Sequence, residues 1–348
     1  MKTLILLPVM LFITSALCAQ DKLTRYFPAG LTDGQVLIDN YLRPLGEDIC
    51  ILPNNGWYTT AKTHKKWGFD LNITVNSVFV SNEKKYFDLP QLSNGLTYQG
   101  STTGNTTQIP TFYADEGEWP LYRIEGGANN GVVFQGAEGS EPGAAYFIDA
   151  FFLPNIQMGL GLGFLKNTDL RVRFTPRTPI SSVEVGSWGI GIMHDIRQHL
   201  KVVDENLFFL SVFVGYTKYS IDVDLSGGFD GTDQVGAIST SGFTGQILIG
   251  KDFKIISFYG AAGYETGKTS VDINGTYTVD SYFNSTGDFA TLPQSFILSN
   301  PYSFNYNKSG MRFTAGTRLK LGPITFNGDY SFVGDRRVLT LGFGFTVK

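Results

Sequence analysis

Side chains that could do acid–base, nucleophilic or metal chemistry are few in this sequence. Its three histidines are His64, His194 and His199. A catalytic histidine needs a nucleophile such as serine within hydrogen-bonding reach, and the pattern sets no clear serine beside His194. His194 and His199 stand five residues apart in a short amphipathic patch (194–203), and on a helix that spacing does not bring two ligands to one face. We therefore expect no enzymatic activity, no metal site and no cofactor.

Basic side chains recur at alternate positions in two segments of the chain. Alternate residues of an extended strand share a face. The basic residues that fall on polar faces are Arg171, Arg173, Arg312, Arg318 and Lys320. Inside a barrel such charges can stay solvated or pair with acids, for which Asp70 and Asp329 are candidates. Structural pairing and the steering of anions are both compatible with this basic stripe.

The segments that position these charges alternate between large apolar and small or polar residues. The clearest is the last one, whose apolar face consists of Leu339, Leu341, Phe343, Phe345 and Val347. The same period of two recurs in 67–76, 156–164, 170–174, 311–321 and 324–332. Such segments of about 10 residues, split by turns, are typical of a transmembrane β-barrel with lipid on one face and the lumen on the other. A soluble β-sandwich has the same period, but Arg and Lys beside Gly on the polar faces and aromatics near strand ends favour the barrel.

We expect an all-β fold, a transmembrane antiparallel β-barrel of about 12–14 strands over residues 67–348, with a short N-terminal helical segment. Tight turns at Gly322-Pro323 and 251–254 should lie at one end of the barrel. Longer polar connections, such as 270–301, should lie at the other end. Residues 83–142 are poorly patterned and are predicted to form one long loop with an extra hairpin.

Composition and the N-terminus agree with export to a membrane. Only 17% of the residues are charged and 14% are aromatic, whereas soluble domains average about 25% charged. The net charge of -4 argues against binding of nucleic acid, which needs clustered basic surface. Residues 1–19 have the basic start, the short apolar run and the small residues of a signal peptide. Its removal would leave Cys50 as the remaining cysteine, without a disulfide partner.

Residues 20–66 are predicted to be a helical, plug-like segment before the barrel. The apolar residues of 33–46 lie near helical spacing, with Asp33 as a candidate N-cap. We expect this helix inside or across the periplasmic mouth. Both faces of 207–214 are apolar, and a lipid-facing strand needs only one. The second face, Phe208, Leu210, Val212 and Val214, would contact the plug or a hydrophobic ligand; a β-bulge that flips the strand's phase is the alternative.

Several short stretches of sequence are distinctive as a set. They are NYLRPL (40–45), NGWYTTAKTHK (55–65), GFD (68–70), LPN (153–155), GLG (159–161), NTDLRVRFTP (167–176) and GIGIMHDI (189–196). Together they resemble an uncharacterised family of outer-membrane proteins from Bacteroidota, catalogued as a domain of unknown function, although Met193 stands where we expect Lys. The resemblance implies an outer-membrane barrel, distantly similar to FadL-type transporters of hydrophobic compounds, in which an N-terminal segment plugs the lumen. It implies no substrate.

Two functions are therefore open. The first is passive uptake or diffusion of small or hydrophobic solutes across the bacterial outer membrane. The second is a structural or surface-binding barrel with a closed lumen and no transport. In both cases the expected partners are outer-membrane lipids and the barrel assembly machinery, with a hydrophobic small molecule as a further candidate and nucleic acid excluded.

Overall fold

The computed structural model describes residues 22–141, 150–180, 182–200, 207–226 and 229–347. The predicted signal peptide lies outside these residues. The model is an all-β structure with one long N-terminal helix, as the alternating pattern predicts. No helix of the described part of the chain is both long and apolar enough to cross a membrane.

The main element is one antiparallel sheet of eleven strands, ten of which close into a barrel, here called the ring. The ring strands, in order around the barrel, are β1 (Phe69–Phe79), β7 (Ala150–Gly161), β8 (Thr168–Ile180), β9 (Val183–Asp195), β10 (Phe209–Asp224), β11 (Asp230–Asp252), β12 (Ile256–Phe283), β14 (Tyr302–Leu321), β15 (Ile324–Val333) and β16 (Arg336–Val347). The ring closes where β16 pairs with β1, for example at Ile73↔Phe343. The remaining strand, β13 (Phe289–Ser299), pairs with β12 alone.

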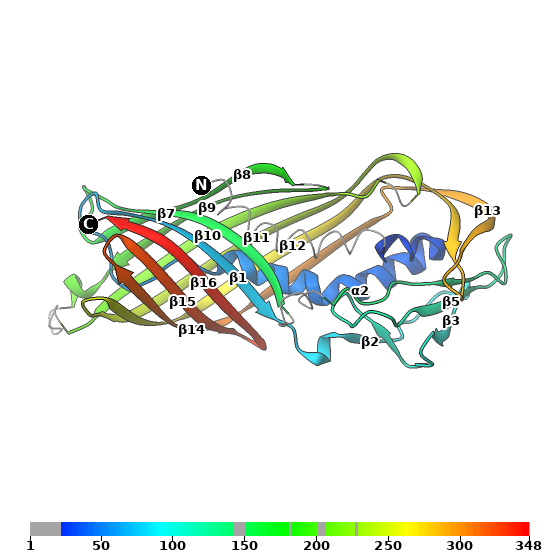
Figure 1. Ribbon diagram of the computed structural model, residues 1–348, viewed down its shortest axis with the longest axis horizontal. Coiled ribbons are helices and arrows are strands. Elements are labelled where there is room, and N and C mark those ends of the chain that lie inside the picture. The colour runs from blue at the N-terminus through cyan, green and yellow to red at the C-terminus, as the bar shows by residue number, and fades with distance from the viewer. Residues whose placement is uncertain (1–21, 142–149, 181, 201–206, 227–228, 348) are drawn as a thin grey trace.

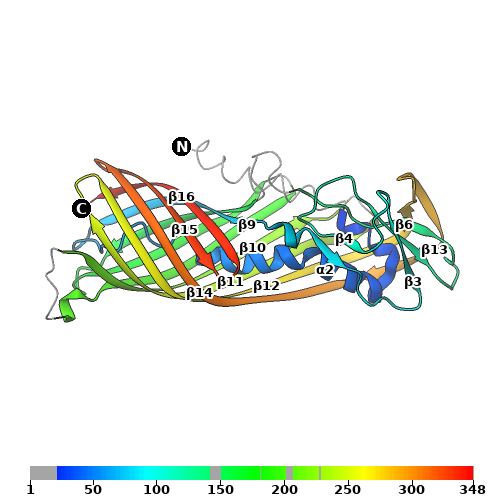
Figure 2. The same ribbon diagram turned by 90° about the horizontal axis from the view of Figure 1, so that it is seen from below.

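The two ends of the barrel differ (Figure 1). At one end, here called the turn end, β16 finishes and only Gly322 and Pro323 join β14 to β15. At the other end, here called the cap end, β12 and β14 continue far beyond the short strands β15 and β16, as Figures 1 and 2 show. Strand β12 has 28 residues, whereas β15 has 10. The barrel is therefore much taller on one side than on the other.

A small cap packs against this tall side. Its elements are η3 (Asn82–Lys84), β2 (Tyr86–Asp88), β3 (Leu96–Ser101), β4 (Gln108–Pro110), β5 (Pro120–Ile124) and β6 (Val133–Gln135). The short helix η1 (Phe27–Ala29) and the long helix α2 (Gly30–Ile51) lie between the cap and the tall strands (Figure 1). Aromatic rings join the layers: Tyr41 meets Phe112 of the cap, and Phe27 meets Tyr302 of β14. Most of the apolar core thus lies at the cap end.

The outer face of the ring is apolar. Side chains that are exposed there include Ile192, Met311, Phe313, Phe326, Leu341 and Phe343. Their neighbours along each strand, such as Arg312 and Thr340, are buried inside. This is the inverse of a soluble sandwich, in which the apolar face is the buried one.

Four expectations about the fold are wrong in detail. In the described residues the ring has ten strands rather than about 12–14, and residues 83–141 contribute to the cap and not to the barrel. The expected loop 270–301 is instead the continuation of β12, the strand β13 and the turn to β14. The reason is that β12 carries inward apolar residues, including Val271, Ile273 and Tyr277, which pack into the cap-end core. Helix α2 is longer than the expected 33–46, and Asp33 does not cap it but accepts hydrogen bonds from the backbone and hydroxyl of Ser93.

Candidate functional site

The chain passes through the middle of the ring before it enters the first strand. Helix α2 packs along β14 and β12, enters the ring near Glu47 and Asp48, and is followed by η2 (Leu52–Asn54). Residues 52–66, here called the plug, then continue to the turn end, where β1 begins. The helix therefore lies at the cap end rather than at the turn end, where we expected it, and the plug fills the ring instead.

The close approach of helix and wall depends on small residues. A Cβ at Gly267 of β12 would lie 1.8 Å from the carbonyl oxygen of Cys50. A Cβ at Gly46 of α2 would lie 2.1 Å from the ring of Tyr306. Larger side chains at these positions cannot be accommodated without moving the helix, so the glycines let it lie directly against the wall.

Two arginines of the predicted basic stripe hold the plug by its backbone. Arg173 donates hydrogen bonds to the carbonyl oxygens of Pro53 and Asn55, the former at 2.8 Å. Arg171 donates to the carbonyl oxygen of Trp57 at 3.0 Å. The guanidinium of Arg173 also lies over the Trp57 ring, 3.7 Å from its centroid. Both arginines are essentially fully buried, so these bonds are shielded from water and are costly to break.

The other three members of the stripe also point inward. Arg312 pairs with Glu265 at 2.9 Å and donates to the side chain of Asn55. Arg318 lies 3.5 Å from the hydroxyl of Thr59, and Lys320 lies beside it at the turn end. All five residues are thus on the inner face, but along the ring they contact the plug and the acids between strands rather than an open channel.

The candidate acids are also in the ring. Asp70 lies 4.0 Å from Arg171, and Asp329 accepts a hydrogen bond from the hydroxyl of Tyr259 at 3.2 Å. Structural pairing therefore accounts for much of the stripe.

Aromatic side chains fill the space that the backbone of the plug leaves. Trp57 and Tyr58 contact Phe213 of β10, with ring centroids 5.4 and 5.7 Å apart. Tyr58 also packs edge-on against Tyr259 of β12 and donates to Gln246. These side chains form a second buried cluster, separate from the cap-end core. At this level the ring is occupied by protein.

The face of 207–214 that contacts the plug is opposite to the one we predicted. Val214 is exposed on the outer side of β10, and Phe208, Leu210 and Val212 are only partly buried. The inward residues are Ser211, which donates to the carbonyl oxygen of Ala61, and Phe213. Period two could not decide between two apolar faces. The deciding contact comes from Trp57, far away in sequence.

His64 ties the end of the plug to two strands. Its Nδ1 lies 2.9 Å from the carboxylate of Asp169 on β8, and its Nε2 lies 3.3 Å from that of Asp70 on β1. Burial by itself lowers the pKa of His64, but the hydrogen bonds and charges of Asp169 and Asp70 outweigh it and raise this pKa to about 9. His64 is therefore protonated at neutral pH and forms ion pairs with Asp169 and Asp70, here called the latch.

This latch makes stability depend on pH. The pKa of His64 is about 9 in the folded protein, against an ordinary value of 6.5. The charged pair therefore stabilises the fold fully below pH 6.5, progressively less as pH rises, and no longer above pH 9. We expect the stability difference between wild type and His64→Gln to shrink by about 3 kcal/mol across this window. Chemical unfolding of the two proteins from pH 6 to 10 measures it. The control His199→Gln, at an exposed position, should follow wild type, and parallel pH curves for His64→Gln and wild type would show that no latch exists.

Sequence reasoning also missed a histidine pair. The Nε2 atoms of His194 and His199 are 3.1 Å apart. The argument from helical spacing is wrong because His194 lies in strand β9, one residue before its end at Asp195, and the chain turns back through η5 (Arg197–His199). In the part of the chain that is described, no group of three or more His, Cys, Asp or Glu residues could hold a metal ion.

The wall of the ring is incompletely paired at one place. Strands β7 and β8 pair only from Gln157↔Arg173 to Gly161↔Asp169, although both strands continue toward the cap end. Beyond this point β8 contains Pro176 and Pro179, which cannot donate to a ladder, and its register with β9 shifts between Thr175 and Thr178. In the described strands the ladder between β7 and β8 thus ends about halfway up, here called the wall gap.

These features define a class of protein, an antiparallel β-barrel whose lumen is occupied by its own N-terminal segment. The chain belongs to a family of unknown function, DUF6588, whose model matches residues 1–347. No curated protein sequence matches it.

Among solved structures, the chain is similar to three barrels. The attachment invasion locus protein Ail of Yersinia pestis is 10% identical, covering 81% of this chain and 99% of that chain, with a TM-score of 0.25. The outer membrane protease OmpT of Escherichia coli is 7% identical, covering 80% and 94%, with a TM-score of 0.28. The toluene transporter TodX of Pseudomonas putida is 8% identical, covering 85% and 93%, with a TM-score of 0.25. TM-scores this low carry no argument about the function of this chain.

Proposed function

We propose that this chain is a bacterial outer-membrane β-barrel that takes up small hydrophobic solutes by a lateral route through its wall rather than through an open pore. The apolar outer face of the ring supports a position in lipid. The tight connections at the turn end match the short periplasmic turns of such barrels, and the tall strands and cap match their extracellular side. Outer-membrane lipids and the barrel assembly machinery are then its partners, in keeping with the resemblance to barrels of Bacteroidota and FadL-type transporters.

The wall gap is the observation that carries this proposal. The interior beside it is apolar, with Val78, Leu153, Val185 and Ile221 all in the cap-end core. The hydroxyl of Tyr219 reaches across the interior to the carbonyl oxygen of Pro154 on β7 at 3.2 Å. An apolar solute can move between this interior and the surrounding lipid without passing the plug. A hydrophilic solute gains nothing from such a route, because it would have to enter the apolar layer.

The gap can be tested by closing it. Pro154→Cys with Pro176→Cys, in a Cys50→Ser background, places thiols on either side of the gap, three positions beyond the last β7–β8 pair along each strand. We expect expression of the protein to raise cellular uptake of labelled aromatic hydrocarbons and fatty acids but not of arabinose. A short bifunctional maleimide should abolish this gain in the double-cysteine protein. The same reagent should have no effect on Ile190→Cys with Tyr216→Cys, a pair on two strands that are already joined.

The alternative function predicts other outcomes. If expression raises the uptake of neither solute class, the protein is a closed structural or surface-binding barrel. If expression raises the uptake of arabinose as much as that of the hydrocarbons, the barrel is an open pore and the lateral route is wrong.

A further inference from the structure

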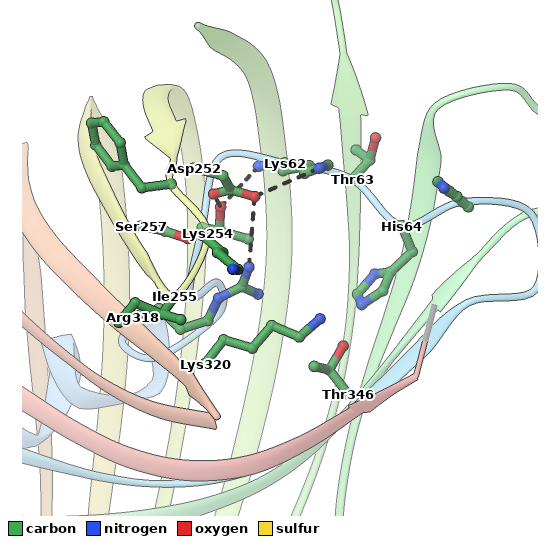
Figure 3. Close-up of a pocket in the computed structure, with 13 residues that line it drawn as sticks. Lys62, Thr63, His64, Asp252, Lys254, Ile255, Ser257, Arg318, Lys320 and Thr346 are labelled. Carbon is green, nitrogen blue, oxygen red and sulfur yellow. Dashed lines mark hydrogen bonds and ion pairs between the residues drawn. The ribbon is translucent and has the colours of Figure 1, made fainter. Parts of the chain in front are cut away.

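A cavity of about 320 Å³ opens at the turn end, between the plug and the wall. Figure 3 shows its lining: Lys62, Thr63 and His64 come from the plug, whereas Lys254, Arg318 and Lys320 come from the β11–β12 turn and β14. Lys65 of the plug completes the basic lining. We call this space the mouth cavity.

The charges around the mouth cavity are not balanced within its lining. Even without Lys320, which has a further interaction of its own, four lysine and arginine side chains of the lining face a single carboxylate, Asp252. Asp252 is shared between Lys62 at 3.7 Å and Arg318 at 3.8 Å, distances too long for good hydrogen bonds. Asp70 and Asp169 lie outside the lining, where both pair with His64, and the charge of Asp70 also acts on Arg318. Lys62 and Lys65 of the plug therefore face Lys254 and Arg318 of the wall across the cavity, with Asp252 as the acid in the lining between them.

A buried hydrogen-bond donor of Arg318 likewise indicates that the cavity has too few acceptors. Arg318 is about nine-tenths buried, and its Nε has no hydrogen-bond partner. A buried guanidinium with an unsatisfied N–H is costly unless something accepts from it. The hydroxyls of Thr63, Ser257 and Thr346 also border the space. Such a convergence of cations and hydroxyls is the donor set that a phosphate group needs.

We propose that the mouth cavity binds a phosphate group, either as the free ion or as part of a phospholipid headgroup of the periplasmic leaflet. The bound phosphate bridges Lys62 and Lys65 of the plug to Lys254, Arg318 and Lys320 of the wall. It thereby replaces the repulsion between the two sets of cations with attraction and holds the plug in the ring. This site does not depend on whether solutes pass the wall gap.

Binding of inorganic phosphate to the purified full chain in detergent tests the site. Isothermal titration should show saturable binding that chloride or nitrate at equal ionic strength does not reproduce. Lys65→Gln and Lys254→Gln, one from each side, should each weaken binding at least about tenfold. Lys166→Gln removes the same charge at an exposed position on the turn end outside the lining and should bind as wild type does. Hydrogen exchange of residues 60–66 should slow when phosphate is added.

The two sources of phosphate give different results. Native mass spectrometry of protein extracted from lipid should retain one phospholipid, lost in Lys254→Gln, if the headgroup is the ligand; free phosphate then competes only after delipidation. If binding of free phosphate is equal in lipid nanodiscs and in delipidated protein, the free ion is the ligand. Absence of both, or equal affinity in wild type, Lys65→Gln and Lys254→Gln, would overturn the proposal.

Discussion

Arg312→Met is expected to destabilise the barrel by about 3–5 kcal/mol, because it leaves Glu265 as an unpaired charge in the interior. The two side chains are 2.9 Å apart and only 2% and 1% exposed. Arg312 also donates to Asn55 of the plug and to Ser331 of β15, so its loss leaves further buried acceptors unsatisfied. The free energy of unfolding in urea, measured in detergent micelles or lipid vesicles, gives this value directly.

A second variant separates charge from packing. Arg312→Met with Glu265→Gln removes both charges and should recover a large part of the lost stability. Arg337→Met, one position after the buried Arg336 and exposed, should be within about 0.5 kcal/mol of wild type. If Arg312→Met and Glu265→Gln prove additive, the two side chains do not act as a pair and the argument from buried charge fails.

Arg171→Gln with Arg173→Gln is expected to turn a closed barrel into a conducting one. These arginines bind three carbonyl oxygens of the plug, those of Pro53, Asn55 and Trp57. Glutamine is too short to reach them all and carries no charge, so the plug loses buried hydrogen bonds worth roughly 1.5–3 kcal/mol each. In planar lipid bilayers we expect wild type to show almost no ion current and the double variant to show at least about tenfold more.

The control for this experiment is another arginine of the same strand. Arg177 of β8 is more than half exposed and pairs with Glu184 and Asp222 on neighbouring strands. Arg177→Gln removes a charge without touching the plug and should stay closed. If the double variant assembles, resists heat as wild type does and still carries no current, its other contacts hold the plug and the two arginines are not what closes the barrel.

The direction of each side chain was the most predictable part of this fold. In β14 and β16 one face is large and apolar and the other is polar, so period two placed Phe343 outside and Arg312 inside. Where both faces are apolar, as in β10, the same reasoning put the plug contact on Leu210 and Val212 rather than on Phe213. That choice depends on Trp57, which meets β10 only in the folded barrel.

Strand number and plug position were less predictable for related reasons. We divided the chain into segments of about 10 residues, the length that crosses a membrane, but β11 and β12 have 23 and 28 residues. The additional residues of these strands contact α2 and the cap, and a local sequence pattern does not predict such long-range contacts. The helical pattern of 33–46 was correct in kind, yet its amphipathic face says nothing about which end of the barrel it meets. Only part of the mouth cavity could be predicted from the sequence. Alternation identified Arg318 and Lys320, whereas Lys62 and Lys254 lie in irregular backbone.

The course of the chain through the ring also constrains the order of assembly. Lys22 is fixed in the cap by Glu116 and the carbonyl oxygen of Gly139, whereas β1 starts at the opposite end, so residues 52–66 run the length of a ring that is sealed by β1 and β16. If the cylinder closed first, residues 22–51 would have to pass through it from the turn end to reach the cap end. A sheet that wraps around the N-terminal segment avoids this passage, and the joining of the last strand to the first is then the step that encloses it. On this path the segment that blocks the lumen in the mature protein serves, during biogenesis, as the core around which the strands of the barrel assemble.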